Sequence, residues 1–257
     1  GLGDEIMCAR FAAALAARGA SRVTWTCRPE LRVLFDGVIG ANEVASVREG
    51  ESPDVGQHDV WAHMLSVARY LCPSPDSIPS ALPYLRPDAA RFAKWRGHLN
   101  AGGRKIGLVW KGGAQHPNDA HRSLPSLTAL QPLWSVPDVT FYALQKGRDE
   151  NLATPMSQPM VNLGPKLSDF ADTAAVIAQL DLVISIDTAV AHLAGALGKP
   201  CWILVPAINP DWRWIAGRDD TPWYPDAVRL FRQAKPGDWV QPVQCMAAEL
   251  AGFVRRP

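Results

Sequence analysis

Short apolar runs rich in β-branched residues recur through the second half of the chain, with helical patterns between most of them. Runs of this kind are typical of strands that are buried on both faces of a parallel sheet. The clearest helical patterns cover residues 124–134 and 169–179, and a last helix is predicted over residues 243–255. Strands and helices alternating at this spacing predict a doubly wound parallel sheet. Its predicted strands cover residues 106–110, 140–144, 160–163, 182–186, 201–205 and 229–231.

The first hundred residues follow a weaker version of the same α/β pattern. A glycine turn that opens a helix normally follows a strand. No strand precedes the turn formed by Gly1 and Gly3, so we expect the first domain to lack its first β-strand. The predicted elements are helices over residues 5–18 and 29–35 and strands over residues 21–27, 43–47 and 59–63.

A proline-rich stretch separates the two patterns. Prolines crowd residues 72–88, which favours an irregular connection, because proline is excluded from helix interiors. A helical pattern over residues 89–100 is then broken by Ala-Gly-Gly-Arg, and we place the domain boundary there. The chain is predicted to form an incomplete Rossmann-like domain over residues 1–100 and a second one over residues 101–257, facing one another across a ligand cleft.

The predicted strand at residues 182–186 runs directly into a predicted helix over residues 189–197. Asp187 and Thr188 stand between them as N-cap residues, and Ala189 is small enough to let a ligand approach. Free backbone N–H groups and the positive end of the helix dipole form an anion site, and phosphate is its usual ligand. The alternative is an ordinary strand–helix unit that binds nothing at its turn.

The loop of residues 110–123 also follows a strand, so it is predicted to lie at the same end of the sheet. Lys111 and Arg122 are expected to bind diphosphate oxygens, Arg122 through its planar guanidinium. Asp119 is expected to orient Arg122 or His116. The histidines and carboxylate of this loop do not follow a recognised ligand spacing, so no metal site is predicted.

Two further strand-end loops suit a nucleoside, because ligands bind at the carboxyl ends of parallel strands. Gln145 or Lys146 is expected at the ribose, and Leu167, with Pro165 nearby, is expected against the base. Plain loops are the alternative. His192 lies further along the helix after the anion turn, either as a packing histidine or as a contact of the donor phosphates.

Asp4 follows the glycine turn at the start of the first predicted helix. Aspartate is a preferred N-cap, and this is one interpretation of the residue. The other is a general base, a carboxylate that takes the proton from a substrate hydroxyl. Gly1 and Gly3 would let the backbone approach the same ligand.

Composition narrows the class of protein. The hydrophobic content of 47% and the charged content of 20% are those of a globular protein, and the net charge of +1 favours no nucleic-acid partner. No apolar run approaches the length of a membrane span. The five cysteines are scattered and odd in number, which is typical of reduced thiols in a cytoplasmic protein.

Three motifs together resemble glycosyltransferase family nine, the family of the bacterial lipopolysaccharide heptosyltransferases. They are Gly-Leu-Gly-Asp at residues 1–4, the Trp-Lys-Gly…His-Pro-Asn-Asp…Arg-Ser loop at residues 110–123, and Ser-Ile-Asp-Thr-Ala-Val-Ala-His-Leu-Ala-Gly-Ala-Leu-Gly-Lys-Pro at residues 185–200. The resemblance is closer still to the related domains that follow tetratricopeptide repeats in some bacterial proteins. Those domains share Ala-Leu-Gln-Lys-Gly, Asp-Phe-Ala-Asp-Thr-Ala-Ala, Asp-Trp-Arg-Trp and Trp-Tyr-Pro, which end here at residues 147, 175, 214 and 225.

The resemblance implies a GT-B fold, with the acceptor bound mainly by the first domain and the nucleotide-sugar by the second. Asp4 falls on the position of the proposed catalytic base, and Arg122 on that of a basic residue at the donor phosphates. Residues 187–189 match the donor-binding Asp-Thr-Gly motif, with Ala189 in place of its glycine. Gly1, Gly3 and His63 would lie on the acceptor side.

The implied activity is inverting, metal-independent transfer of a hexosyl or heptosyl group from a nucleotide-diphosphate sugar, without a cofactor. The acceptor would be a hydroxyl of a glycan, of a lipid-linked saccharide of the lipopolysaccharide type, or of a protein. A peripheral contact with the inner membrane and an upstream repeat domain in the full-length protein remain open. The alternatives are a nucleotide-sugar epimerase or hydrolase, and a non-catalytic nucleotide-sugar-binding or interaction module.

Overall fold

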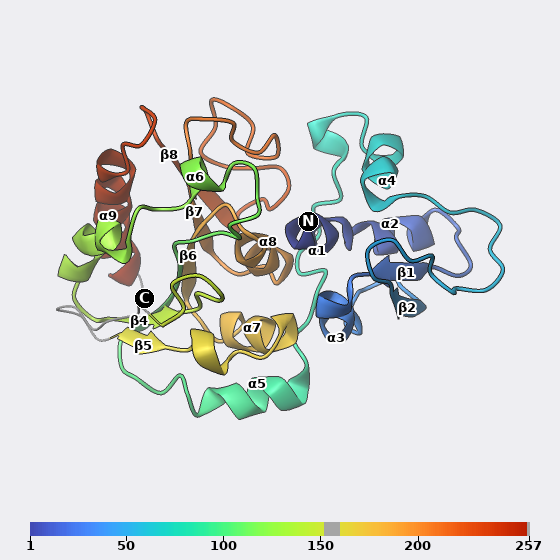
Figure 1. The fold of residues 1–257 in the computed structure, drawn as a ribbon, viewed down its shortest axis with the longest axis horizontal. Coiled ribbons are helices and arrows are strands. Elements are labelled where there is room, and N and C mark those ends of the chain that lie inside the picture. The colour runs from blue at the N-terminus through green and yellow to red at the C-terminus, as the bar shows by residue number, and fades with distance from the viewer. Residues whose placement is uncertain (152–159, 256–257) are drawn as a thin grey trace.

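A computed structural model describes residues 1–151 and 160–255 of the chain. Figure 1 shows a larger lobe, in which helices flank one sheet, and a smaller lobe formed by the N-terminal part of the chain. The larger lobe contains the doubly wound parallel sheet that the sequence predicted, so this prediction is confirmed.

The sheet of the larger lobe has six parallel strands in the order β5-β4-β3-β6-β7-β8. Because β3 pairs with both β4 and β6, the winding of the chain reverses between β3 and β6. Ligands of open α/β sheets bind at such a switch point, beyond the carboxyl ends of the strands. The strands are β3 (Arg104–Val109), β4 (Val139–Ala143), β5 (Met160–Asn162), β6 (Leu182–Ile186), β7 (Cys201–Val205) and β8 (Val228–Arg232).

Each face of this sheet is covered by helices and has its own apolar core. One core contains Leu182, Ile184 and Ile186 of β6 and is closed by the 3₁₀ helix η3 (Leu127–Ser135) and by α9 (Val240–Val254). Pro132 lies inside η3 and lacks an N–H group, which agrees with a 3₁₀ segment where the pattern predicted an ordinary helix.

The opposite face packs against α7 (Phe170–Ile177) and α8 (Ala189–Ala196), which Figure 1 shows on the side of the smaller lobe. Its core contains Val183 of β6 and continues without a break to Ile6 and Phe11 in the first lobe. The two lobes therefore share one apolar core.

The smaller lobe is built around β1 (Thr24–Cys27) and β2 (Glu43–Ser46), which pair in parallel. Its helices are α1 (Leu2–Cys8), α2 (Phe11–Ala17), η1 (Pro29–Leu31), α3 (Arg32–Phe35) and α4 (Met64–Leu71). The helix expected over residues 5–18 is thus divided between Cys8 and Phe11. Arg10 lies at this junction and is buried, with its guanidinium turned to Tyr84 and to the carbonyl of Trp223.

The strand predicted over residues 59–63 is wrong. This segment is irregular, and its apolar side chains are on the surface, with Val60 85% and Trp61 83% exposed. An apolar run forms a buried strand only where a neighbouring strand and a core receive it. His63 is the N-cap residue of α4 and is exposed, with its ring 5.7 Å from that of Trp61.

The connection between the lobes contains η2 (Pro75–Ser77) and α5 (Ala89–Arg96), and α5 lies against α7 of the larger lobe. Arg91 of α5 donates to Asp169 and Asp172, in each case over 2.8 Å. Trp95 Nε1 donates to Asp172 over 3.0 Å. These contacts attach α5 to the larger lobe, although it precedes the boundary placed at residue 100.

Candidate active site

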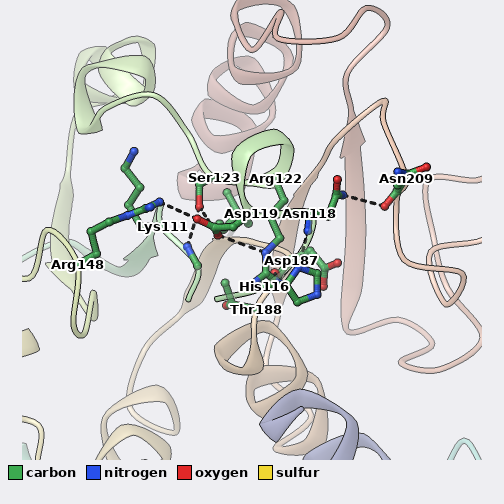
Figure 2. Close-up of polar contacts among 12 residues, drawn as sticks. Lys111, His116, Asn118, Asp119, Arg122, Ser123, Arg148, Asp187, Thr188 and Asn209 are labelled. Carbon is green, nitrogen blue, oxygen red and sulfur yellow. Dashed lines mark hydrogen bonds and ion pairs between the residues drawn. The ribbon is translucent and has the colours of Figure 1, made fainter. Parts of the chain in front are cut away.

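The predicted polar loops meet where β3 and β6 end. The loop after β3 contains α6 (Asp119–Arg122), and the turn after β6 contains Asp187 and Thr188. Figure 2 shows Arg122 reaching from α6 toward Asp187 and Thr188, with α8 starting just below them. The cluster therefore occupies the switch point of the sheet, where a ligand is expected.

Arg122 is nearly buried and is held from two sides. Its Nη1 donates to the backbone carbonyl of Asp187 over 2.8 Å, and its Nε lies 3.5 Å from Asp119 Oδ1. Within the part of the chain that the structure describes, this Nε has no hydrogen-bond partner. The expected pairing of Asp119 with Arg122 is therefore present as an ion pair.

Asp119 is the centre of this polar cluster (Figure 2). Its carboxylate accepts a hydrogen bond from Ser123 Oγ over 2.8 Å and one from Arg148 Nη2 over 2.9 Å. Ser123 Oγ in turn accepts from the backbone N–H of Gly112 over 2.9 Å. A Cβ atom on Gly112 would come 2.6 Å from Asp119 Oδ1 and 2.7 Å from Arg122 Nη2. A side chain at this position would therefore have to displace the Asp119–Arg122 pair.

An open pocket of about 450 Å³ adjoins the cluster and is lined by Lys111, His116, Asp119 and Arg148, among others. Lys111 Nζ donates to the carbonyl of Pro125 over 3.0 Å and stays within the pocket lining. Burial, assisted by the charge of Arg122, lowers the pKa of His116, so this imidazole is neutral near pH 7. The positive charge of the pocket thus comes from lysine and arginine.

The turn after β6 has the expected shape of a helix start. Thr188 is the N-cap of α8 in an extended conformation, and its hydroxyl lies 3.1 Å from Ser185 Oγ. The first N–H groups of an α-helix have no partner within it and carry the positive end of the dipole. These groups belong to the turn at Thr188 and Ala189, where the sequence predicted an anion site.

Asp187 is buried beside this turn. Burial, reinforced by the negative charge of Asp211, raises the pKa of Asp187 to about 6. Its carboxylate is therefore still largely ionised at pH 7, but it takes up a proton under mildly acidic conditions.

Asp4 approaches from the first lobe on α1, which packs directly against α8. Its carboxylate pairs with Arg213, whose Nη2 donates to Oδ1. Partial burial raises the pKa of Asp4, but the charge of Arg213 opposes this effect and favours the ionised form. Asp4 is therefore ionised near pH 7, as a general base requires.

His192 lies between the two helices rather than at an open surface. Its Nδ1 is 2.8 Å from the hydroxyl of Tyr224, and its ring stacks on Trp214 with centroids 5.2 Å apart. Burial, together with the charge of Arg213, lowers the pKa of His192 to about 3, so the ring is neutral. A Cβ atom on Gly3 would come 2.8 Å from His192 Cδ2, so Gly3 permits the close approach of α1 to α8.

The residues predicted to contact the nucleoside differ in how deeply they are buried. Gln145 is buried, and its amide accepts from the N–H groups of Trp110 and Lys111 and donates to the carbonyls of Lys111 and Lys146. A contact of Gln145 with the ribose would have to break one of these bonds. Leu167 is buried in the shared core.

Two other predicted nucleoside contacts are closer to the surface. Lys146 is half-exposed and donates from Nζ to the carbonyl of Gly164 over 3.1 Å. Pro165 lies in the short 3₁₀ helix η4 (Gly164–Lys166), which follows β5. Both belong to loops at the carboxyl end of the sheet, as predicted.

Sequence reasoning missed Arg213 and Arg148. Arg213 belongs to the Asp-Trp-Arg-Trp stretch, to which the sequence assigned no residue of the site. Arg148 follows the Gln-Lys-Gly stretch that was assigned to the nucleoside. Arg148 could have been found from its place in a strand-end loop. The contact of Arg213 with Asp4 joins residues 209 positions apart, so no local pattern in the sequence indicates it.

Searched over residues 1–151 and 160–255, the structure holds no group of three or more His, Cys, Asp or Glu side chains arranged to hold a metal ion. No helix in these ranges combines the length and apolar character that a membrane crossing needs.

The fold and the site define the class of protein. A six-stranded parallel sheet in Rossmann order, a second α/β lobe packed on it, and a polar site between them form a GT-B type architecture. Residues 139–204 match the family description "Glycosyltransferase family 9 (heptosyltransferase)".

A curated relative is Protein FlbA from Caulobacter vibrioides, which is 31% identical over 276 residues. The match covers 98% of this chain and 45% of FlbA, so the chain spans about half the length of this relative.

Three solved structures share the fold. ADP-heptose lipopolysaccharide heptosyltransferase II from E. coli has a TM-score of 0.67 at 16% identity, over 98% of this chain and 96% of that one. A family 9 glycosyl transferase from Veillonella parvula has a TM-score of 0.62 at 13% identity, over 91% and 83% of the two chains. E. coli heptosyltransferase WaaC with ADP-2-deoxy-2-fluoro heptose has a TM-score of 0.56 at 12% identity, over 97% and 95%.

The resemblance to glycosyltransferase family 9 is thereby confirmed over residues 139–204, and the solved structures share the fold over nearly the whole chain. These findings support sugar transfer as the class of activity. The association with tetratricopeptide repeats stays a prediction.

Proposed function

We propose that the chain transfers a sugar from a nucleotide-diphosphate sugar to an acceptor hydroxyl, with inversion at the anomeric carbon and without a metal ion. The observation that carries this proposal is the approach of an ionised carboxylate, Asp4, on one helix to an anion-binding turn at the start of the helix packed against it. Nucleophile activation and leaving-group stabilisation are the two functions that such a transfer requires.

The diphosphate would lie against the turn at Thr188 and Ala189. The N–H groups of this turn, the positive charge of Arg122 and the positive end of the α8 dipole all favour a negatively charged ligand. Lys111 and Arg148 line the adjoining pocket and add positive charge. With these groups fixed before the reaction, charge that develops on the departing diphosphate is stabilised without a metal ion.

Asp4 would act on the acceptor. Its carboxylate takes the proton of the acceptor hydroxyl while that oxygen forms a bond to the anomeric carbon, and the bond from this carbon to the diphosphate oxygen breaks. A direct displacement of this kind inverts the configuration at the anomeric carbon. Gly1, Gly3 and His63 remain the proposed acceptor-side residues.

The donor is identified here by its class, a nucleotide-diphosphate sugar carrying a hexose or a heptose. The family description and the E. coli relative named for ADP-heptose make ADP-heptose the first donor to test. The proposed acceptors are a glycan, a lipid-linked saccharide and a protein hydroxyl.

The experiment compares the wild-type chain with Asp4→Asn in two assays. Calorimetric titration with ADP, UDP and GDP measures binding of the leaving group, and transfer from the matching nucleotide-sugars measures turnover. We expect Asp4→Asn to lower kcat by about 10²- to 10⁴-fold, which is the usual contribution of a general base. Nucleotide affinity should remain nearly unchanged, since Asp4 lies on the acceptor side.

Two results would contradict the proposal. Equal turnover by Asp4→Asn would remove Asp4 as the base. A wild-type chain that binds none of the three nucleotides would remove the donor site, and hydrolysis of the donor at the same rate with and without acceptor would favour a hydrolase.

A further inference from the structure

Arg213 stands at the junction of the two lobes and is 3% exposed. Its guanidinium meets two carboxylates, because Nη2 donates to Asp4 and Nη1 donates to Asp211 Oδ2 over 2.6 Å. Its Nε contacts the thioether sulfur of Met7 over 2.8 Å. Three nitrogen atoms of one side chain are thus engaged, and two of these contacts reach α1 in the other lobe.

Asp211 fixes the position of Arg213 through two hydrogen bonds. Its Oδ1 accepts the backbone N–H of Arg213 over 2.9 Å, so one carboxylate fixes both the backbone and the guanidinium. The hydroxyl of Thr221 donates to the carbonyl of Arg213 over 3.1 Å, and the guanidinium lies over the ring of Trp212 at 4.7 Å. The side chain is therefore presented to Asp4 in one orientation.

A buried arginine in this protein does not need a carboxylate partner. Arg10 is buried at the junction of α1 and α2, and its guanidinium donates to the carbonyls of Met7, Pro79 and Trp223 and to the hydroxyl of Tyr84. Carbonyls and a hydroxyl are thus sufficient to satisfy a guanidinium here. The pairing of Arg213 with Asp4 therefore calls for a reason other than satisfaction of the arginine.

We propose that Arg213 is a positioning residue that fixes the carboxylate of Asp4 for proton transfer from the acceptor. The inference rests on the proposed function, because it takes Asp4 as the base. The planar guanidinium of Arg213 donates to Asp4 and to Asp211 at the same time, and the single ammonium group of a lysine does not reproduce this geometry. The loop that carries Arg213 belongs to the larger lobe, so the orientation of the base is set by the lobe that would bind the donor.

The test separates geometry from charge with two substitutions. Arg213→Lys keeps the positive charge but loses the planar guanidinium. Arg213→Gln loses the charge but keeps the capacity to form hydrogen bonds. The control is Arg218→Lys, because Arg218 lies in the same loop and pairs with Asp220 on the exposed surface. Each variant is assayed for kcat, for the KM of the donor and for the pH profile of kcat/KM, after thermal melting has shown that it is folded.

For Arg213→Lys we expect kcat to fall about 10- to 100-fold with little change in the KM of the donor, because a displacement of about 1 Å at a catalytic group costs about 10²-fold. For Arg213→Gln the acid limb of the profile should move to higher pH, because the positive charge that favours the ionised form is gone. His192 also faces Asp4, but it is neutral through burial and is unchanged in the variants. The control should match the wild type.

The decisive comparison uses the Asp4→Asn background. If Arg213 acts through Asp4, adding Arg213→Lys to Asp4→Asn should lower kcat no further. A full additional loss in the double variant would overturn the inference, as would unchanged kcat and unchanged pH profile in both single variants. Such results leave the proposed function intact as long as Asp4→Asn is itself impaired. Wild-type turnover by Asp4→Asn would instead refute the proposed function.

Discussion

Gly3→Ala tests whether the contact between α1 and α8 sets the geometry of the site. The new Cβ would come 2.8 Å from His192 Cδ2, about 0.7 Å closer than a carbon–carbon contact of about 3.5 Å allows. His192 cannot retreat cheaply, because it is bonded to Tyr224 over 2.8 Å and stacked on Trp214. We therefore expect α1 to move away from α8 and to carry Asp4 with it.

The change in the free energy of unfolding caused by Gly3→Ala follows from two opposing effects. Overpacking a buried contact costs about 1–3 kcal/mol, and replacing glycine by alanine within a helix returns up to about 1 kcal/mol. Gly252→Ala in α9 is a matched control, because it gains the helical preference while its Cβ meets nothing within 4 Å. The two variants should therefore differ by about 1–3 kcal/mol, and each kcal/mol lowers the Tm by about 2–4 °C in a chain of this size.

Thermal unfolding followed by circular dichroism measures this difference, and sugar transfer measured on the folded variants reports the displacement of Asp4. Gly3→Ala should melt several degrees below Gly252→Ala and should have a lower kcat. The reasoning is refuted if the two variants melt together and Gly3→Ala keeps wild-type turnover. In that case the contact with His192 would not hold the two helices in register.

Two further predictions concern the donor side. Gly112→Ala should weaken nucleoside diphosphate binding by about tenfold or more, because its Cβ would come 2.7 Å from Arg122 Nη2, whereas Gly113→Ala, whose Cβ meets nothing within 4 Å, should bind like the wild type in calorimetry. Asp187→Asn should alter the pH dependence of stability. The pKa of Asp187 is about 6 in the folded chain, against an ordinary pKa of 3.8 in the unfolded chain. Its contribution to stability is therefore full below pH 3.8 and is lost as the pH rises through 6. Relative to the wild type, the variant should therefore gain about 2–3 kcal/mol in free energy of unfolding between pH 4 and pH 7 in urea titrations, and parallel curves would contradict this.

The elements of the larger lobe could be predicted because their strands are buried on both faces. The runs at Leu182–Ile186 and Cys201–Val205 coincide with β6 and β7, and every residue of both strands is buried. The first lobe gave weaker predictions, since its strands are short and partly exposed. At residues 59–63 an apolar run lies on the surface, and no pattern within the run distinguishes this from a buried strand.

The candidate site could be predicted only as far as strand ends and helix starts define it. Arg122 and Thr188 follow β3 and β6 in the sequence, so topology alone brings them together. The hydrogen-bond partners of a side chain within a loop cannot be predicted in this way. Gln145 looks available for a ligand in the sequence, but its amide is used to hold the backbone of the loop after β3. Arg213 depends on a contact between lobes, which no local pattern encodes.

The shared core has a consequence for how the site works. Ile6 of α1 and Val183 of β6 belong to one buried cluster, and the Asp4–Arg213 pair joins the same two lobes. Swinging one lobe away would expose apolar area at about 25 cal/mol per Å² and leave Arg213 with one of its two carboxylates. The distance between the proposed base and the proposed anion-binding turn is therefore set by side-chain packing rather than by the linker between the lobes. For this reason substitutions at the α1–α8 contact should change kcat, whereas substitutions around Arg122 should change nucleotide affinity.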